Sequence, residues 1–377
     1  MNYREKMEHF LVDKFNGRIK PLEIEDFETI NKHKDNTFGF SFAGLMLYCN
    51  GMNEKAISHY APMGLLYNDG ENIMGIGIFK KGVAEKNIYV HIVAPRGKDW
   101  MKCIDEIEGN LKEYSEEKTY AIIVRHIKDN EYNELIEAGY QNIEIDPWDI
   151  QAPQEDETYN NRLVELSKIV KNEGNDIVVE SLTNEEAKNY KKKTRLAYNR
   201  FRNFLSYNNA ELVYEKYTPQ YIDVAKSIVE SHFASLKNRV GSTPQDYYNL
   251  IEKSFYEENK VYAYIGFLKI QNEKIPVSLF IGEVIGEKNV ALYATFATRN
   301  IELKDDVNTI GFSAISQYCY VRIFSMLQKE GIKFADLGGS ELDELNTFKK
   351  QLGAVLIDTY WAIKICWQIQ KNELKYK

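Results

Sequence analysis

The stretch FADLGGSELDELNTFKKQLGA, residues 334–354, joins an apolar strand to a charged helix through two adjacent glycines. The residues IKFADL are typical of a buried strand, and LDELNTFKKQLG has the spacing of a helix that ends at Gly353. Asp336 stands at the end of the strand, and Lys349 lies in the last turn of the helix. A strand, a glycine turn and a helix in this order indicate an α/β arrangement.

The residues around this stretch continue the alternation of strands and helices. The apolar periodicity of the second half predicts a strand at 211–217, a helix at 219–236, a strand at 260–270, a hairpin at 274–299 that turns at 286–289, a helix at 311–331 and an apolar run at 354–367. The first half has a similar order: a strand at 17–24, a helix at 26–34, a hairpin at 63–82, a strand at 87–93, a helix at 98–114, a strand at 119–127, a helix at 130–140 and a strand at 142–145.

A segment without a hydrophobic focus, residues 146–158, separates the two halves. We interpret it as a linker into a helix that ends at Gly174 and whose apolar positions are Leu163, Leu166, Ile169 and Val170. The predicted fold class is α/β (α+β), with two units in tandem, each a mixed, mostly antiparallel sheet flanked by helices.

The composition is that of an ordinary globular protein, with 44% hydrophobic and 28% charged residues and a net charge of −8. This charge does not favour a protein that coats nucleic acid, although a local basic patch can still bind it. The four cysteines are scattered in apolar or helical contexts, which predicts buried, reduced thiols. The charged N-terminus lacks a secretory core and no stretch has the length of a membrane span, so we expect a cytoplasmic protein.

The second half resembles the Fem-type aminoacyltransferases, which build peptidoglycan cross-bridges, and their wider tandem-GNAT relatives. The resemblance covers roughly residues 176–366 and depends most on the segment from Asp336 to Gly353. A basic helix, AKNYKKKTRLAYNRFRNFL, adds to it. The resemblance implies a degenerate N-terminal GNAT-like domain at 1–155, a linker and helix at 156–175, and an active C-terminal GNAT-like domain at 176–377 with a basic helix at 185–206.

The activity implied is transfer of an acyl or aminoacyl group to an amine on a small molecule or peptide, without a metal or a covalent intermediate. The donor is acyl-CoA or aminoacyl-tRNA. The absence of a long helical hairpin in the second half favours acyl-CoA, whereas the Fem-like segment and the basic helix favour tRNA, so both remain open. The alternative is a non-enzymatic binding module whose two GNAT sites have decayed.

Each half has a loop that a donor phosphate could approach, since free backbone amides at a helix start bind anions. In the first half VAPRGKDW, residues 93–100, offers Ala94 where the GNAT loop has Gln or Arg, and Asp99 would repel a pyrophosphate. We therefore interpret it as a helix start. The second loop, residues 308–313, contains no acidic residue and is the predicted donor site, formed by Asn308, Thr309, Gly311, Phe312 and Ser313.

The candidate catalytic residues are Lys349, Asp336 and Tyr293. Lys349 matches the Phe-Lys of the family and could stabilise negative charge, with Phe348 as the packing partner that aims it. Asp336 could orient an amine or a cation, and Tyr293 could donate a proton. Arg299 could hold a phosphate or carboxylate. We interpret Glu283 as a solvent-facing residue, with the role of a base as the alternative.

The basic helix groups Lys188, Lys192, Arg195 and Arg202 on one broad face. A solvated face is the simplest interpretation, yet the local charge is the reverse of that of the chain as a whole. Lys192 and Arg195 are accordingly candidates for binding an anionic partner, such as a nucleotide-linked acceptor, a tRNA or a phospholipid head group. The six histidines are isolated and the sequence has no metal-ligand spacing, so we expect no metal.

Overall fold

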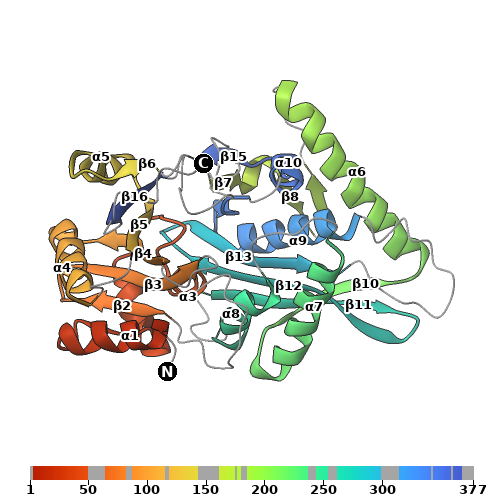
Figure 1. The fold of residues 1–377 in the computed structure, drawn as a ribbon. Coiled ribbons are helices and arrows are strands. Elements are labelled where there is room, and N and C mark those ends of the chain that lie inside the picture. The colour runs from red at the N-terminus through yellow and green to blue at the C-terminus, as the bar shows by residue number, and fades with distance from the viewer. Residues whose placement is uncertain are drawn as a thin grey trace, which may run out of the picture. The chain divides into compact units, whose positions relative to one another are not determined.

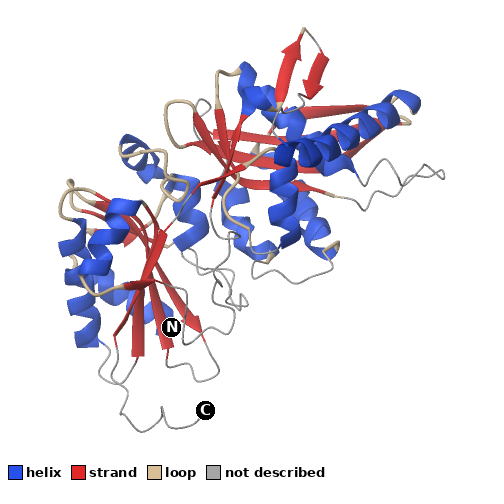
Figure 2. Ribbon diagram, turned by 90° about the horizontal axis from the view of Figure 1, so that it is seen from above, coloured by secondary structure: helices blue, strands red, loops and turns tan. Residues whose placement is uncertain are grey.

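The computed structural model describes residues 3–49, 64–81, 87–114, 119–142, 161–174, 176–179, 185–236, 243–253, 261–298, 314–340, 343–357 and 360–366 (Figure 1). The chain divides into two compact units. Unit 1 comprises Met1–Asp156 and Asp358–Lys377, and unit 2 comprises Glu157–Ile357. Each unit has one large sheet with helices packed on it (Figure 2).

Unit 1 alternates short helices with strands as its apolar periodicity predicts, and two further helices were not foreseen. The helices are α1 (Tyr3–Lys14), α2 (Phe27–Lys32), α3 (Phe42–Cys49), α4 (Trp100–Tyr114) and α5 (Asp129–Glu137). The strands are β1 (Ile19–Pro21), β2 (Leu65–Asn68), β3 (Ile73–Lys81), β4 (Asn87–Arg96), β5 (Thr119–Ile127), β6 (Gln141–Asn142) and β16 (Tyr360–Cys366). α1 and α3 are the additions to the predicted elements.

Unit 2 has the same kind of sheet and longer helices. The helices are α6 (Glu185–Tyr207), α7 (Ile222–Ala234), α8 (Tyr248–Lys253), α9 (Ile315–Lys329) and α10 (Asp343–Gln351). The strands of the large sheet are β7 (Asn161–Glu165), β10 (Glu211–Lys216), β11 (Val261–Ile270), β12 (Glu273–Val284), β13 (Asn289–Ala297), β14 (Phe334–Asp336) and β15 (Val355–Ile357). A small second sheet pairs β8 (Val170–Glu173) with β9 (Asp176–Val179).

In both large sheets the strands follow one another in chain order, except for the sixth strand, which comes from a distant part of the sequence. Unit 1 has the order β1-β2-β3-β4-β5-β16-β6, and unit 2 has the order β10-β11-β12-β13-β14-β7-β15. β16 pairs antiparallel with β5 and β6, and β7 pairs antiparallel with β14 and β15. β7 therefore completes the sheet of unit 2 directly after the chain leaves unit 1, and β16 returns to complete the sheet of unit 1.

The positions of β7 and β16 in the two sheets correct two expectations from the sequence. The helix predicted to end at Gly174 is wrong, because residues 161–165 form β7 and residues 170–173 form β8. The apolar run at 354–367 is split between two sheets, so its second part belongs to unit 1 and not to a continuous domain 176–377. Short apolar runs fit the helical and the strand period equally well, and their partners come from the other half of the chain.

Alternating side chains give the sheet of unit 1 two different faces. Met74, Ile76 and Ile92 point to the face covered by α1 and α4, where they join one apolar core. Gly75 points to the other face, where α3 approaches so closely that a Cβ on Gly75 would lie 2.6 Å from the Cys49 Sγ. Cys49, Cys103 and Cys319 are buried thiols, as predicted.

The segment 93–100 is a structural turn, in agreement with its interpretation as a helix start. α4 begins at Trp100, and the Asp99 amide donates a 2.9 Å hydrogen bond to the Asn72 Oδ1. Gly97 has φ +123°, and a Cβ there would lie 2.5 Å from the Glu71 carbonyl oxygen. These contacts fix the start of α4 against the turn between β2 and β3.

Gly97→Ala should therefore destabilise the protein by about 2 kcal/mol or more, because it adds a methyl group to a left-handed, closely packed position. The matched control is Gly109→Ala on an exposed position of α4, where a Cβ meets nothing within 4 Å. That variant should gain about 0.5–1 kcal/mol from the higher helix propensity of alanine. Thermal unfolding compares the two, and a Gly97 variant as stable as wild type would contradict this packing.

Candidate functional site

The candidate site lies in unit 2, where the parallel strands β13 and β14 cease to pair. Their register runs from Asn289 opposite Phe334 to Ala291 opposite Asp336, and there it ends. β13 continues to Ala297, whereas the chain after β14 turns toward β7, because the Leu337 amide donates to the Arg162 carbonyl at 2.8 Å. In the described part of the chain, no strand pairs with this edge of β13 beyond Ala291.

A β-bulge lies directly beyond this point. On β13, Leu292 pairs with Gly282 and Ala294 with Ile281, so Tyr293 has no partner across the ladder. Bulges redirect a side chain and are frequent beside active sites. The Tyr293 side chain is buried. The sheet of unit 1 shows a related arrangement, since the pairing of β4 with β5 ends at Val93 and Ala94 follows with φ +47°.

Two buried carboxylates flank Ala291 in one row across the sheet. Glu283 on β12 and Asp336 on β14 are both in register with it. Val290, which precedes Ala291 on β13, and Ala335, which precedes Asp336 on β14, point into the core under α9. The row of Glu283, Ala291 and Asp336 therefore faces the opposite side of the sheet. Glu283 is 0% exposed, so its interpretation as a solvent-facing residue is wrong. The apolar pattern predicted the strand that carries Glu283, but it did not predict that the face of the sheet on which Glu283 lies is buried.

Asp336 is held in place by two donors. Its carboxylate accepts hydrogen bonds from the Gly338 amide at 2.9 Å and from the Asn161 Nδ2 at 3.2 Å. Burial raises the pKa of the Asp336 carboxyl to about 7, while the Gly338 hydrogen bond and the charge of Lys349 act in the opposite direction. At neutral pH this carboxyl can therefore accept and release a proton.

Lys349 fixes the glycine turn that follows Asp336. It projects from α10, is 5% exposed, and its ammonium donates to the carbonyls of Leu337 at 2.7 Å, Gly338 at 3.0 Å and Gly339. A lysine ammonium has three protons, so these three carbonyls match its hydrogen-bonding capacity. The contacts indicate a residue that positions the turn, and the catalytic role expected from the sequence stays a prediction.

Other side chains support the same turn. Phe348 packs edge-on against Tyr320, with ring centroids 5.4 Å apart. The buried Arg162 donates from Nε to the Asn346 Oδ1 at 2.8 Å, which joins β7 to α10. Asn161 and Arg162 could not be predicted from the sequence, because they stand at the start of a segment whose apolar spacing favours a helix and no motif marks them. Arg299 and the predicted donor loop, Asn308 to Ser313, lie outside the described residues.

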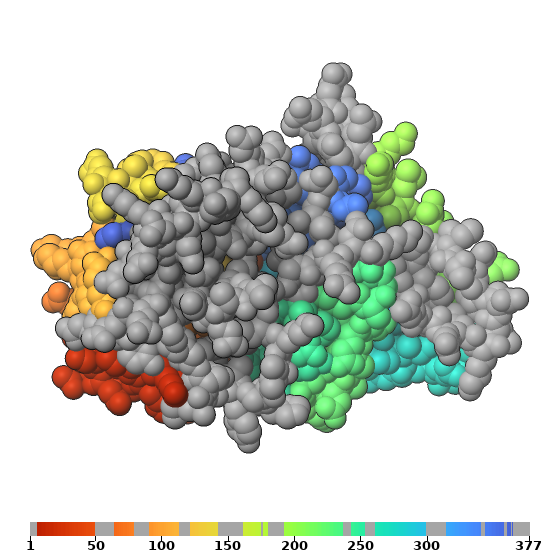
Figure 3. Space-filling view, in the orientation of Figure 1, coloured from red at the N-terminus to blue at the C-terminus, as the bar shows by residue number. Residues whose placement is uncertain are grey.

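The basic helix exists as predicted and presents its charges to solvent. On α6, Tyr198, Phe201 and Leu205 are buried in the core of unit 2, and the Thr194 hydroxyl donates to the Gln351 carbonyl at 2.6 Å. Part of α6 lies at the surface of the molecule (Figure 3). The exposed side chains on its other face are Lys192, Lys193, Arg195, Arg200 and Arg202. The side chain of Lys188 lies outside the described residues.

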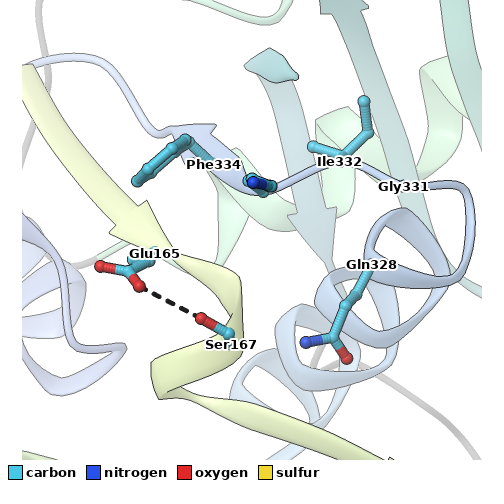
Figure 4. Close-up of a pocket in the computed structure, with 7 residues that line it drawn as sticks. Glu165, Ser167, Gln328, Gly331, Ile332 and Phe334 are labelled. Carbon is cyan, nitrogen blue, oxygen red and sulfur yellow. Dashed lines mark hydrogen bonds between the residues drawn. The ribbon is translucent and has the colours of Figure 1, made fainter.

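A surface pocket of about 380 Å³ lies at the other end of β14 (Figure 4). Its lining includes Phe334, Gln328 and Ile332, and a 3.2 Å hydrogen bond from the Ser167 hydroxyl to Glu165. Because Phe334 begins β14 and Asp336 ends it, this pocket is separate from the candidate site. Across the described ranges, no cluster of three His, Cys, Asp or Glu side chains could hold a metal ion. The helices described include none with the length and apolar character needed to span a membrane.

Comparison with solved structures establishes the fold. A conserved protein of unknown function from Bacteroides thetaiotaomicron is similar over 92% of this chain and 98% of its own, with a TM-score of 0.59 and 13% identity. FemX is similar over 92% and 97%, with a TM-score of 0.54 and 11% identity. L-PGS from Bacillus licheniformis is similar over 91% and 92%, with a TM-score of 0.53 and 12% identity.

The sequence itself matches no protein-family model and no curated protein. The structural likeness nevertheless confirms the predicted fold class and the resemblance of this chain to FemX at the level of the fold. Identities this low support the fold alone.

Proposed function

We propose that this chain of two GNAT-like units in tandem is an acyltransferase that moves an acyl or aminoacyl group from a carrier to an amine. The amine nitrogen attacks the acyl carbonyl and forms a C–N bond. The C–S bond of an acyl-CoA or the ester C–O bond of an aminoacyl-tRNA breaks. The amine loses a proton and the leaving thiol or hydroxyl gains one, so the reaction needs a base, an acid and a group that polarises the carbonyl.

The observation that supports this proposal is the strand junction in unit 2. There β13 loses its parallel partner after Ala291, bulges at Tyr293, and lies beside a buried carboxyl at the end of β14. An edge of β13 without a neighbouring strand offers backbone groups on which an acyl carbonyl can lie. We assign the base to Asp336, because its raised pKa suits proton transfer near neutral pH.

The remaining roles follow from position. Tyr293, the bulge residue, is the proposed proton donor to the leaving group. Lys349, aimed by Phe348, holds the turn after Asp336 and thereby fixes the carboxyl relative to β13. Asn308, Thr309, Gly311, Phe312 and Ser313, with Arg299, stay the proposed contacts for donor phosphates, which both donors carry.

We further propose that the exposed basic face of α6 binds an anionic partner, either a tRNA donor or a nucleotide-linked acceptor. Reversing Lys192 and Arg195 to glutamate should leave the melting temperature nearly unchanged, because both side chains are exposed. The affinity for total tRNA, measured by fluorescence anisotropy at several salt concentrations, should fall about tenfold or more, with a shallower salt dependence.

The control for this experiment is the double variant Lys269→Glu and Lys288→Glu. It changes the net charge by the same amount at exposed positions on β11 and on the turn before β13. If both double variants lose tRNA affinity equally, the effect comes from net charge and the basic face has no specific role. If neither loses affinity, α6 has a solvated face only.

Transfer itself is tested with the purified full chain, a panel of amines and two donors, acetyl-CoA and mixed aminoacyl-tRNA. Mass spectrometry should detect an amide product with one of the two donors. Absence of product together with absence of binding to both donors would favour a non-enzymatic binding module.

A further inference from the structure

Unit 1 contains a buried cation at the point where its own parallel strands separate. Arg125 is the last residue of β5 in register with β4, opposite Val93, and it is 6% exposed. Its guanidinium lies over the ring of Tyr48 at 4.3 Å and over the ring of Trp361 at 4.8 Å. One Nη donates to the His91 Nδ1 at 3.3 Å. His91 and Trp361 are only half-buried, so the cluster reaches toward the surface of the unit.

A bulge brings the next residue to the same place. Arg125 pairs with Trp361 and Ile127 pairs with Tyr360, so His126 is left out of the ladder between β5 and β16. His126 has φ +57°. Its ring centre lies 4.3 Å from that of Tyr48 and 6.2 Å from that of Trp361, so two consecutive residues contact the same pair of aromatic rings. Backbone strain of this kind is retained mainly at binding sites.

Several hydrogen-bonding nitrogens of Arg125 and His126 have no hydrogen-bond partner among the described residues. The Arg125 Nε and both ring nitrogens of His126 are buried without a hydrogen-bond partner, and within the described ranges no carboxylate pairs with Arg125. Arg96 on the neighbouring strand differs, since it contacts Asp35 at 2.8 Å and Glu131 at 3.3 Å. Buried polar groups are nearly always bonded and buried cations are nearly always paired.

We infer that unit 1 binds a carboxylate ligand at Arg125 and His126. A guanidinium that lies over aromatic rings can present its N–H edge to a ligand, and this edge matches the two oxygens of a carboxylate. Burial lowers the pKa of His126 and the charge of Arg125 lowers it further, so the imidazole stays neutral and donates one hydrogen bond. Burial lowers the pKa of Arg125 to about 10, which leaves it charged at neutral pH. One positive charge suits a carboxylate better than a phosphate dianion.

Calorimetry of the full chain tests this site with N-acetylglycine, a peptide-type carboxylate, and benzoate, an aromatic acid. Inorganic phosphate and the neutral N-acetylglycinamide serve as controls. At least one carboxylate should bind with a stoichiometry of one, the amide should not bind, and Arg125→Met should weaken binding at least tenfold. The acid that binds more tightly shows whether the site prefers a peptide-type carboxylate or an aromatic acid. Equal binding by Arg125→Met, tighter binding of phosphate, or no carboxylate binding would overturn the inference.

The stability of the unliganded variants gives an independent readout. Replacing an unpaired buried cation by an apolar side chain should leave the melting temperature unchanged or raise it. Arg96→Met should lower it by about 5 °C or more, because Asp35 and Glu131 each lose the contact with the buried Arg96 cation. A comparable loss in Arg125→Met would mean that a carboxylate of the chain already pairs with Arg125, which would also overturn the inference. None of these results depends on acyl transfer in unit 2.

Discussion

Replacement of Lys349 by methionine is expected to lower the free energy of unfolding by about 3–5 kcal/mol. The ammonium is buried and donates to the carbonyls of Leu337, Gly338 and Gly339. Methionine keeps the apolar stem but removes the donor from two buried carbonyls and one half-buried carbonyl, and each unsatisfied buried group costs about 1–3 kcal/mol. It also removes the positive charge that opposes the rise in the pKa of Asp336, so that pKa should increase further.

Lys350→Met is the matched control, because the adjacent lysine is only half-buried on the same helix. Its stability should stay within about 0.5 kcal/mol of wild type. Chemical denaturation of both variants measures the difference. If Lys349→Met were as stable as Lys350→Met, the turn after β14 would not depend on the ammonium, and Lys349 would be available for a direct part in catalysis.

Asp336→Asn is expected to reduce kcat by about 100- to 1,000-fold, or about 3–4 kcal/mol in activation free energy. Asparagine has nearly the same shape and can still accept the hydrogen bond from the Gly338 amide, so the fold should survive. The wild-type rate should rise with pH as the Asp336 carboxyl loses its proton around pH 7. The residual rate of the variant should lack that rise.

Thermal unfolding of Asp336→Asn provides the necessary control. A melting temperature close to that of wild type, with a large loss of rate, assigns the effect to chemistry. A variant whose rate keeps the wild-type pH dependence would remove Asp336 from the role of base, and Glu283, the other buried carboxylate in the row, would become the candidate.

The sequence predicted the local elements well where periodic segments were long. The hairpin of β12 and β13, the helix α9 and the turn from β14 to α10 lie where their apolar spacing and glycines indicated. The sheets that β7 and β16 join could not be predicted, because each strand is short and its partners are distant in sequence. Their apolar patterns fit either sheet.

The candidate site could be predicted only in part, because several of its contacts come from segments that are distant in the sequence. Asp336 and Lys349 were found through a motif resemblance, but the burial of Lys349 depends on three carbonyls of the glycine turn. Asn161 joins the site only because β7 lies beside β14. In unit 1, the bulge that redirects His126 arises from the register with β16, which a pattern within β5 cannot reveal.

The most direct test of the central claim is a single-turnover measurement of amide formation by wild type and Asp336→Asn with the same donor and amine, from pH 5.5 to 8.5. The claim is that unit 2 transfers an acyl group to an amine at the end of β14. It predicts a wild-type rate that increases through about pH 7 and a rate at least 100-fold lower and flat for the variant. Equal rates for the two proteins, or transfer with an identical pH profile, would contradict it.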